Sequence, residues 1–249
     1  MSAGAIHSPA LLLRSGIGVD DGLPVGKNLK DHASASFMLA LNPRGRRRSI
    51  DEPVIGSLLR YSSGSELAGA GPNDMQMQWF DATGCDETGL AGGMLRASVM
   101  RVFSSAEVRL RSQDPFDDPF VDFCLLSDQR DVVRLRDGVY RMIDIIHQPT
   151  VAAIVDNVTV GAATVDQLTN DDSIDAWLMA TVGDYVHAVG TCRMGPVDDD
   201  AAVVDLNCAV RGYDRLSVVD ASVMPDLPKC NTHLTTVAVA ERFVARTRS

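Results

Sequence analysis

The spacing of apolar residues changes in the middle of the chain, from the period of a strand to the period of a helix. Met75, Met77 and Trp79 alternate with Gln76 and Gln78, as in a strand with one buried face. Between residues 128 and 147 the apolar positions instead recur every three or four residues, at Val132, Leu135, Val139, Met142, Ile143 and Ile146. We therefore expect a β-rich region followed by a long amphipathic helix.

Other segments carry shorter signals of the same two kinds. Alternation over residues 95–99 and 108–111 predicts two further strands, and the apolar run 216–219 predicts a third. Helical spacing predicts a helix from about Asp172 and a last one from about Thr235 to Arg246. These elements indicate a fold that mixes strands and helices.

The first residues resemble the middle of a folding unit. Gly4-Ala5-Ile6 is a tight turn of small residues, and Ser8-Pro9 has the signature of a helix N-terminus, with the helix ending at Gly16 and Gly18. Such a turn normally connects a buried strand to a helix. Because only three residues precede the turn, we expect that strand to be missing from this sequence.

Composition and charge exclude several classes of protein. The chain has 23 basic and 33 acidic residues and a net charge of −10, which argues against nucleic-acid binding. The basic run from Arg44 to Arg48 is expected to be a solvated loop. Five scattered cysteines predict reduced thiols and, with no signal peptide and no apolar run that could span a bilayer, a cytoplasmic protein.

Two of the five histidines lie in segments suited to chemistry. His187 is in DYVHAVGTCRMG, where Gly190 and Gly195 let the backbone approach a ligand closely. His233 is in NTHLTT, immediately before the last helix, where backbone N–H groups are open. These settings suit acid–base chemistry, although either histidine taken alone is more often an ordinary hydrogen-bonded residue.

A zinc site is the competing interpretation of the same segments. His187, Cys192, Cys230 and His233 form a set of two cysteines and two histidines. The His-x₄-Cys spacing is unusual, and Arg193 would place a cation beside the metal. We therefore expect no metal.

Four motifs in order along the chain resemble the glucose–methanol–choline (GMC) family of flavin-dependent oxidoreductases. They are GAIHSPALLLRSGIG from Gly4, LPVGKNLKDH from Leu23, HAVGTCRMG from His187, and VVDASVMP from Val218 followed by NTHLTTVAVAER. The resemblance implies an α+β or α/β fold, in which an incomplete FAD-binding Rossmann-like domain is joined to a substrate domain with an antiparallel sheet flanked by helices. It assigns residues 1–34 and 185–249 to the FAD domain and residues 35–184 to the substrate domain.

The resemblance also implies roles for individual residues. His187 matches the family's active-site histidine and His233 the second active-site position. Asp220 and Ala221 match a segment that lies against the flavin, and Asn231 and Thr235 flank its ring system. The implied cofactor is FAD and the implied substrate a small alcohol, oxidised at its CH–OH group by hydride transfer to the flavin.

The family's G-x-G-x-x-G turn, which receives the FAD diphosphate, does not occur in these 249 residues. One hypothesis is a catalytic half that works with a separate N-terminal FAD-binding half. The other is a non-catalytic truncated remnant or an interaction module. Either way, we expect exposed apolar surface on the last helix, where Val237, Ala240 and Val244 share a face.

Overall fold

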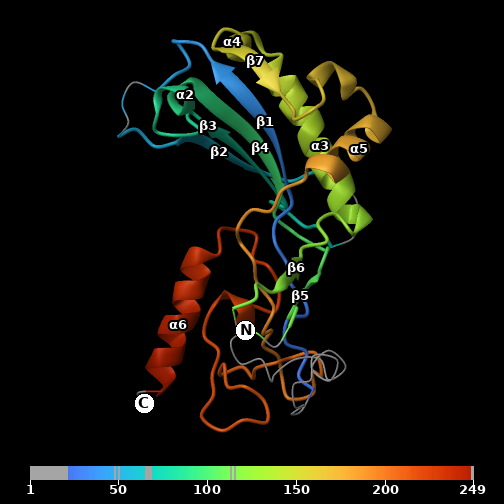
Figure 1. The fold of residues 1–249 in the computed structure, drawn as a ribbon, viewed down its shortest axis with the longest axis vertical. Coiled ribbons are helices and arrows are strands. Elements are labelled where there is room, and N and C mark those ends of the chain that lie inside the picture. The colour runs from blue at the N-terminus through green and yellow to red at the C-terminus, as the bar shows by residue number, and fades with distance from the viewer. Residues whose placement is uncertain are drawn as a thin grey trace. The chain divides into compact units, whose positions relative to one another are not determined.

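The computed structural model describes residues 22–47, 49, 51–64, 69–112, 114 and 116–247. It divides the chain into two compact units (Figure 1). The site unit contains the described residues up to Asp31, with Ser104–Cys124 and the chain from Tyr185 onwards; the sheet unit contains His32–Phe103 and Leu125–Asp184. The opening motif and the helix expected after Ser8 lie outside the described residues.

The sheet unit is built on one antiparallel sheet, so the predicted fold class is confirmed. Its strand order is β2-β3-β4-β1-β7. The bounds are Ser34–Leu41 for β1, Ile55–Tyr61 for β2, Met75–Phe80 for β3, Gly92–Val99 for β4 and Val155–Thr159 for β7. The unit's helices are α2 (Glu87–Ala91), α3 (Gln129–Ile146), α4 (Pro149–Ala152), the short 3₁₀ helix η1 (Val165–Gln167) and α5 (Asp171–Thr181).

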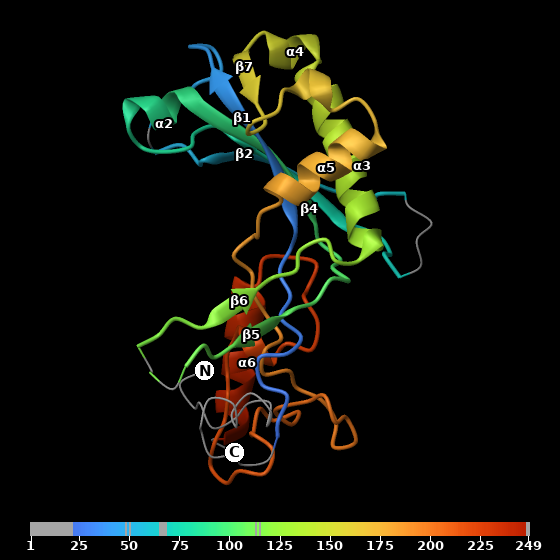
Figure 2. The same ribbon diagram turned by 45° about the vertical axis from the view of Figure 1, so that its right-hand side comes forward.

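Helix α3 covers one face of this sheet (Figures 1 and 2). Asp128 caps its first turn by accepting a hydrogen bond from the N–H of Arg130. Its apolar residues Val132, Leu135, Val139 and Met142 are buried, as their spacing predicts. Gly138 lets the helix approach closely, since a Cβ there would lie 2.9 Å from the Cβ of Ala97 on β4. From α5, Trp177 meets Phe37 edge-on, with ring centroids 5.8 Å apart.

Strand β3 differs from the simple alternation in one respect. Gln76 and Gln78, on the face away from α3, are as buried as their apolar neighbours, with 2% and 4% of their surfaces exposed. The reason is the position of β3, which is an inner strand between β2 and β4. Gln76 and Gln78 lie directly opposite Ser98 and Arg96 of β4. The polar side chains of adjacent strands therefore cover one another.

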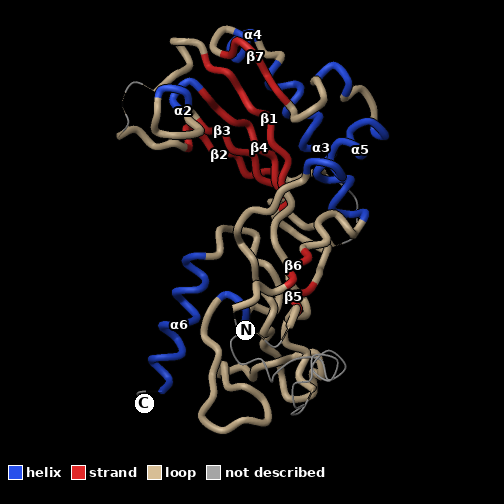
Figure 3. The backbone as a smooth tube through the Cα atoms, viewed as in Figure 1, coloured by secondary structure: helices blue, strands red, loops and turns tan. Residues whose placement is uncertain are grey.

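The site unit consists mostly of loops (Figure 3). Its elements are the paired strands β5 (Glu107–Arg109) and β6 (Phe120–Asp122), the short 3₁₀ helix η2 (Ala221–Val223) and α6 (His233–Thr247). Its core contains Val203, Val204, Val210 and Val223, against which Val239 and Phe243 of α6 pack. The apolar run 216–219 does not form the predicted strand. Only a single bridge forms there, between Ser217 and Ala209, because the described loops offer no longer partner strand.

The division into units differs from the predicted domain boundaries at two places, and residues 32–34, predicted for the FAD domain, belong to the sheet unit. Ser104–Cys124 belongs to the site unit, although the prediction placed all of residues 35–184 in the substrate domain. This segment joins the site unit through reciprocal hydrogen bonds between Leu29 and Ala106. The functional domains 1–34, 35–184 and 185–249 stay a prediction. Among the described residues, no helix is both long and apolar enough to cross a bilayer.

Candidate active site

The segment that carries His187 is fixed to the loop that precedes β1. Lys30 and Val189 exchange two backbone hydrogen bonds of 3.1 and 3.0 Å, and the N–H of Gly26 donates to the carbonyl of Thr191 at 2.8 Å. Two motifs more than 150 residues apart in the chain therefore lie side by side in the site unit. The segment that follows His187 is therefore held by hydrogen bonds at Val189 and at Thr191, on both sides of Gly190.

Asp31 is a residue of this site that the sequence did not reveal. Both of its carboxylate oxygens accept from the backbone N–H of His187, at 3.1 Å each. The carboxylate is 2% exposed, so the contact is shielded from water. Asp31 thus fixes the backbone that carries the imidazole. The sequence shows Asp31 only as an acidic residue in the loop LPVGKNLKDH. Acidic side chains in loops are ordinarily solvated, so nothing in the sequence marks this one as buried.

The imidazole of His187 is half-buried against Tyr185, with the ring centroids 4.6 Å apart. Burial lowers the pKa of His187 below the ordinary value for histidine, which favours the neutral ring. The preceding residue, Val186, has φ of +61° although it is β-branched and 86% exposed. Backbone strain of this kind is found at sites where function requires a particular side-chain placement.

We expect the lowered pKa of His187 to be measurable by NMR titration of its ring protons. Between the lowered pKa and the ordinary one, the unfolded chain binds a proton that the folded chain does not, so stability decreases as pH falls through that range. A general base is active when neutral, so the acid limb of activity is also expected below the ordinary histidine pKa. The variant His187→Gln assigns the resonance. A pKa of His187 at or above the ordinary value would contradict this interpretation.

Gly190 is the position at which the His187 segment tolerates least change. Its φ is +90°, and a Cβ would lie 2.3 Å from the carbonyl oxygen of Asn28. We expect Gly190→Ala to cost roughly 2–5 kcal/mol, from the left-handed conformation and the clash together. The control is Gly64→Ala, at φ +69° with nothing within 4 Å of its Cβ, which is expected to cost about 1–2 kcal/mol. Urea denaturation measures the free energy of unfolding of both variants. Equal losses in the two variants would show that the close approach of Gly190 to Asn28 is unimportant.

The segment predicted to lie against a flavin also packs on the His187 motif. The N–H groups of Cys192 and Met194 donate to the carbonyls of Ser222 and Val223, at 2.9 Å each. Burial raises the pKa of the Cys192 thiol, which keeps it protonated. Asp220 caps the short helix η2 by accepting from the N–H of Ser222 at 2.8 Å. The side chain of Asp220 therefore shapes this segment.

The remaining predicted residues lie at the start of α6. Asn231 and His233 are exposed and Thr235 is half-buried. The N–H of Thr236 bonds to the carbonyl of Thr232, so the N–H groups of His233, Leu234 and Thr235 precede the first bond of this helix. His187 and His233 belong to the same compact unit. Their side-by-side placement around one substrate stays a prediction.

The zinc interpretation required His187, Cys192, Cys230 and His233 to gather around one metal ion. No three His, Cys, Asp or Glu side chains within the described ranges gather closely enough to hold a metal ion. Cys192 instead has its N–H bonded to Ser222, and its thiol is also hydrogen-bonded to that residue. Cys230 lies exposed in a loop.

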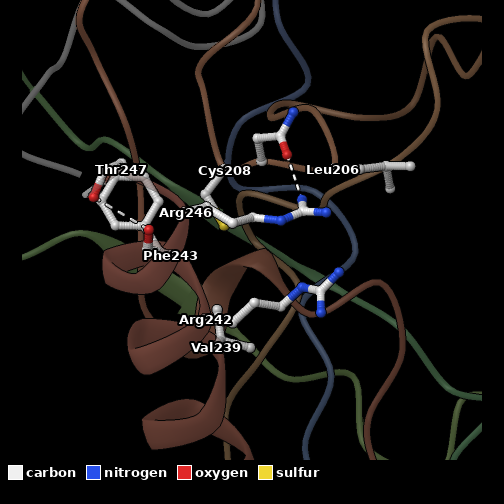
Figure 4. A pocket seen from close by; sticks show the side chains of 8 residues that line it. Leu206, Cys208, Val239, Arg242, Phe243, Arg246 and Thr247 are labelled. Carbon is white, nitrogen blue, oxygen red and sulfur yellow. Dashed lines mark hydrogen bonds between the residues drawn. The ribbon is translucent and has the colours of Figure 1, made fainter. Parts of the chain in front are cut away.

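A separate hollow lies beside α6 and contains none of the predicted site residues. It has a volume of about 210 Å³ and an apolar floor that includes Cys208, Val239 and Phe243. Arg242 and Arg246 reach across it from the helix (Figure 4), and Arg246 donates to the side-chain oxygen of Asn207. This face of α6 is therefore positively charged around an apolar centre.

Solved structures define the class of fold. Pyridoxine 4-oxidase from Mesorbium loti matches with a TM-score of 0.79 and 24% identity, over 98% of this chain and 48% of that protein. A formate oxidase variant from Aspergillus oryzae matches with a TM-score of 0.80 and 20% identity, over 97% of this chain and 50% of that protein. The fold is therefore that of this group of oxidases.

The sequence comparisons name the family. The GMC oxidoreductase C-terminal model matches residues 102–240 and the N-terminal model matches residues 1–34, so the chain belongs to the GMC oxidoreductase family. It is 34% identical to 5-(hydroxymethyl)furfural oxidase of Methylovorus sp. (strain MP688), over 98% of this chain and 49% of that protein. It is 32% identical to an alcohol dehydrogenase [acceptor] of Pseudomonas putida, over 97% and 49%. The chain spans about half the length of these curated relatives.

Proposed function

We propose that this chain supplies the acid–base half of an FAD-dependent oxidoreductase that acts on the CH–OH group of an alcohol. The observation that carries the proposal is the setting of His187: a half-buried imidazole with a lowered pKa, on a backbone held by buried Asp31. The names of its relatives, an oxidase of a furan alcohol and an alcohol dehydrogenase, support the same reaction class.

The chain's own residues act on the hydroxyl proton. A hydroxyl proton is too weakly acidic to leave unaided, so the neutral imidazole of His187 accepts it while the C–H bond breaks. Asp31 contributes by positioning, because its carboxylate accepts hydrogen bonds from the backbone N–H of His187. His233 is the second proposed acid–base group and orients the hydroxyl from the start of α6.

The donors at the start of α6 fit the ring end of a flavin. An isoalloxazine carries carbonyl oxygens and ring nitrogens that accept hydrogen bonds. Asn231, the hydroxyl of Thr235 and the first N–H groups of α6 can donate to them, while small Ala221 permits close contact. FAD would supply the hydride acceptor at this site. The G-x-G-x-x-G turn that would hold the diphosphate end does not occur in this sequence.

A separate N-terminal FAD-binding half is the proposed partner, and α6 is its proposed contact. Val237 and Val244 on this helix are 44% and 38% exposed, and Leu234 is 78% exposed, while Ala240 is half-buried. An exposed apolar stripe of this kind is suited to packing against the sheet of a complete FAD domain. Arg242 and Arg246 would add attraction for acidic side chains beside it.

Co-expression with the N-terminal half of a GMC relative tests the function. We expect the pair to purify with FAD and to oxidise a primary alcohol, and the chain alone to carry little flavin because it lacks the diphosphate turn. A stoichiometric FAD complex of the chain alone would refute the need for a partner. A soluble, FAD-loaded pair that oxidises no alcohol in a broad panel would refute the reaction and favour a non-catalytic module.

A further inference from the structure

The two faces of the five-stranded sheet in the sheet unit differ in chemistry. Residues directly opposite each other on antiparallel strands share a face. Phe37, Met75 and Ala97 lie on the face covered by α3 and α5. On the other face, Arg96 of β4 is directly opposite Gln78 of β3 and Ser36 of β1. A polar band therefore crosses the middle of the sheet on the side away from α3.

An apolar pocket lies beside this band on the same face. Met94 of β4 is directly opposite Phe80 of β3 and Met38 of β1, so the three side chains share the face of Arg96. They line a cavity of about 440 Å³, together with Val54 and the turn of residues 82–85. Met38 is 41% exposed, which keeps the cavity open to solvent. The cavity is large enough for one small ring.

Arg96 joins the pocket to the polar band. Its guanidinium carbon lies 5.5 Å from the centroid of the Phe80 ring, and its Nη2 lies 3.8 Å from the sulfur of Met94. Its Nε donates to the hydroxyl of Ser36 at 3.4 Å. The side chain thus places a planar cation against two residues that line the cavity, Phe80 and Met94, and a carboxylate attached to a ring would suit this arrangement.

We propose that this pocket binds small aromatic or furan carboxylates, with the ring between Met38, Phe80 and Met94 and the carboxylate on Arg96. The ring would displace water from the apolar side chains of the cavity. The guanidinium would donate hydrogen bonds to the carboxylate and supply a local positive charge in a chain whose net charge is −10.

Calorimetric titration of the full chain tests the binding, with 4-(hydroxymethyl)benzoate as the probe and benzyl alcohol as its neutral counterpart. We expect the acid to bind at least roughly tenfold more tightly, the scale of one charge-assisted hydrogen-bonded contact. Arg96→Gln should remove that preference, and Met38→Trp should weaken both ligands by filling the cavity. The matched control is Arg111→Gln, which removes an equal charge from an exposed position in the other unit.

Each result decides for or against the site. Equal affinity for the acid and the alcohol, or an unchanged affinity in Arg96→Gln, would overturn the proposal. So would an equal loss in Arg111→Gln, since that indicates attraction to any cation. If Arg96→Gln does not fold, Arg96→Lys keeps the charge and loses the planar fork, and it should bind the acid several-fold more weakly. Because binding is measured without turnover, failure of the enzyme to oxidise alcohols leaves this result standing.

Discussion

Replacing His187 with alanine in the reconstituted enzyme is expected to lower kcat by roughly a hundredfold or more while FAD stays bound. That is the usual scale for the loss of an acid–base group. The reason lies in the setting of the ring: burial lowers its pKa, so it is neutral and ready to accept a proton near neutral pH. Steady-state kinetics with a saturating alcohol, and the flavin content of the purified variant, measure the two quantities separately.

The matched control for this change is His147→Ala. His147 is exposed at the end of α3 in the sheet unit, and removing its ring is expected to leave kcat within about twofold. His233→Ala should cause a smaller decrease than His187→Ala, since His233 is exposed. Full activity of the His187 variant would show that its proposed role is wrong. Equal loss in the His147 variant would indicate a structural effect.

The largest stability effect is expected from a buried ion network at the start of α3. Arg134 is completely buried, with its Nη2 2.5 Å from Asp131 and its Nη1 3.5 Å from Asp74. Asp74 also accepts from the N–H and hydroxyl of Ser63, and Asp131 from the N–H of Phe103. Arg134→Leu would leave two buried carboxylates without their shared cation, so we expect a loss of about 3–5 kcal/mol in the free energy of unfolding.

Trp79 and Trp177, the two tryptophans of the chain, both lie in the sheet unit, so their fluorescence in urea follows the unit that contains Arg134. Arg141→Leu on the same helix breaks an exposed pair with Asp137 and is expected to cost about 0–1 kcal/mol. Adding Asp74→Asn and Asp131→Asn to Arg134→Leu should restore part of the loss, because the buried charges are then removed. Equal destabilisation by Arg134→Leu and Arg141→Leu would contradict the role of the network.

Local patterns were sufficient for the elements whose burial follows their own sequence. The helix expected at 128–147 is α3 at Gln129–Ile146, and the helix expected from Asp172 is α5 at Asp171–Thr181. Their apolar stripes lie against neighbours and Asp128 supplies an N-cap, so the periodicity alone identifies them. The same holds for β3, apart from its buried glutamines.

Features that depend on a distant partner could not be predicted from local sequence. The run 216–219 is apolar, but in the described part of the chain its pairing is limited to one bridge with Ala209, and the run itself carries no signal of which partner it meets. Asp31 gained its role from a segment 156 residues later in the chain. Motif resemblance identified His187 because its glycine-rich context is local, whereas its supporting carboxylate belongs to a different motif.

The central claim is that His187 accepts the substrate proton in an alcohol-oxidising flavoenzyme. Its most direct test is the rate at which an alcohol reduces the bound flavin in the reconstituted enzyme without oxygen, followed by loss of flavin colour over a range of pH. We predict reduction that slows as pH falls through the lowered pKa of His187, and that is roughly a hundredfold or more slower in His187→Ala at every pH above it. Flavin reduction at the same rate in both proteins, with the same pH dependence, would contradict the claim.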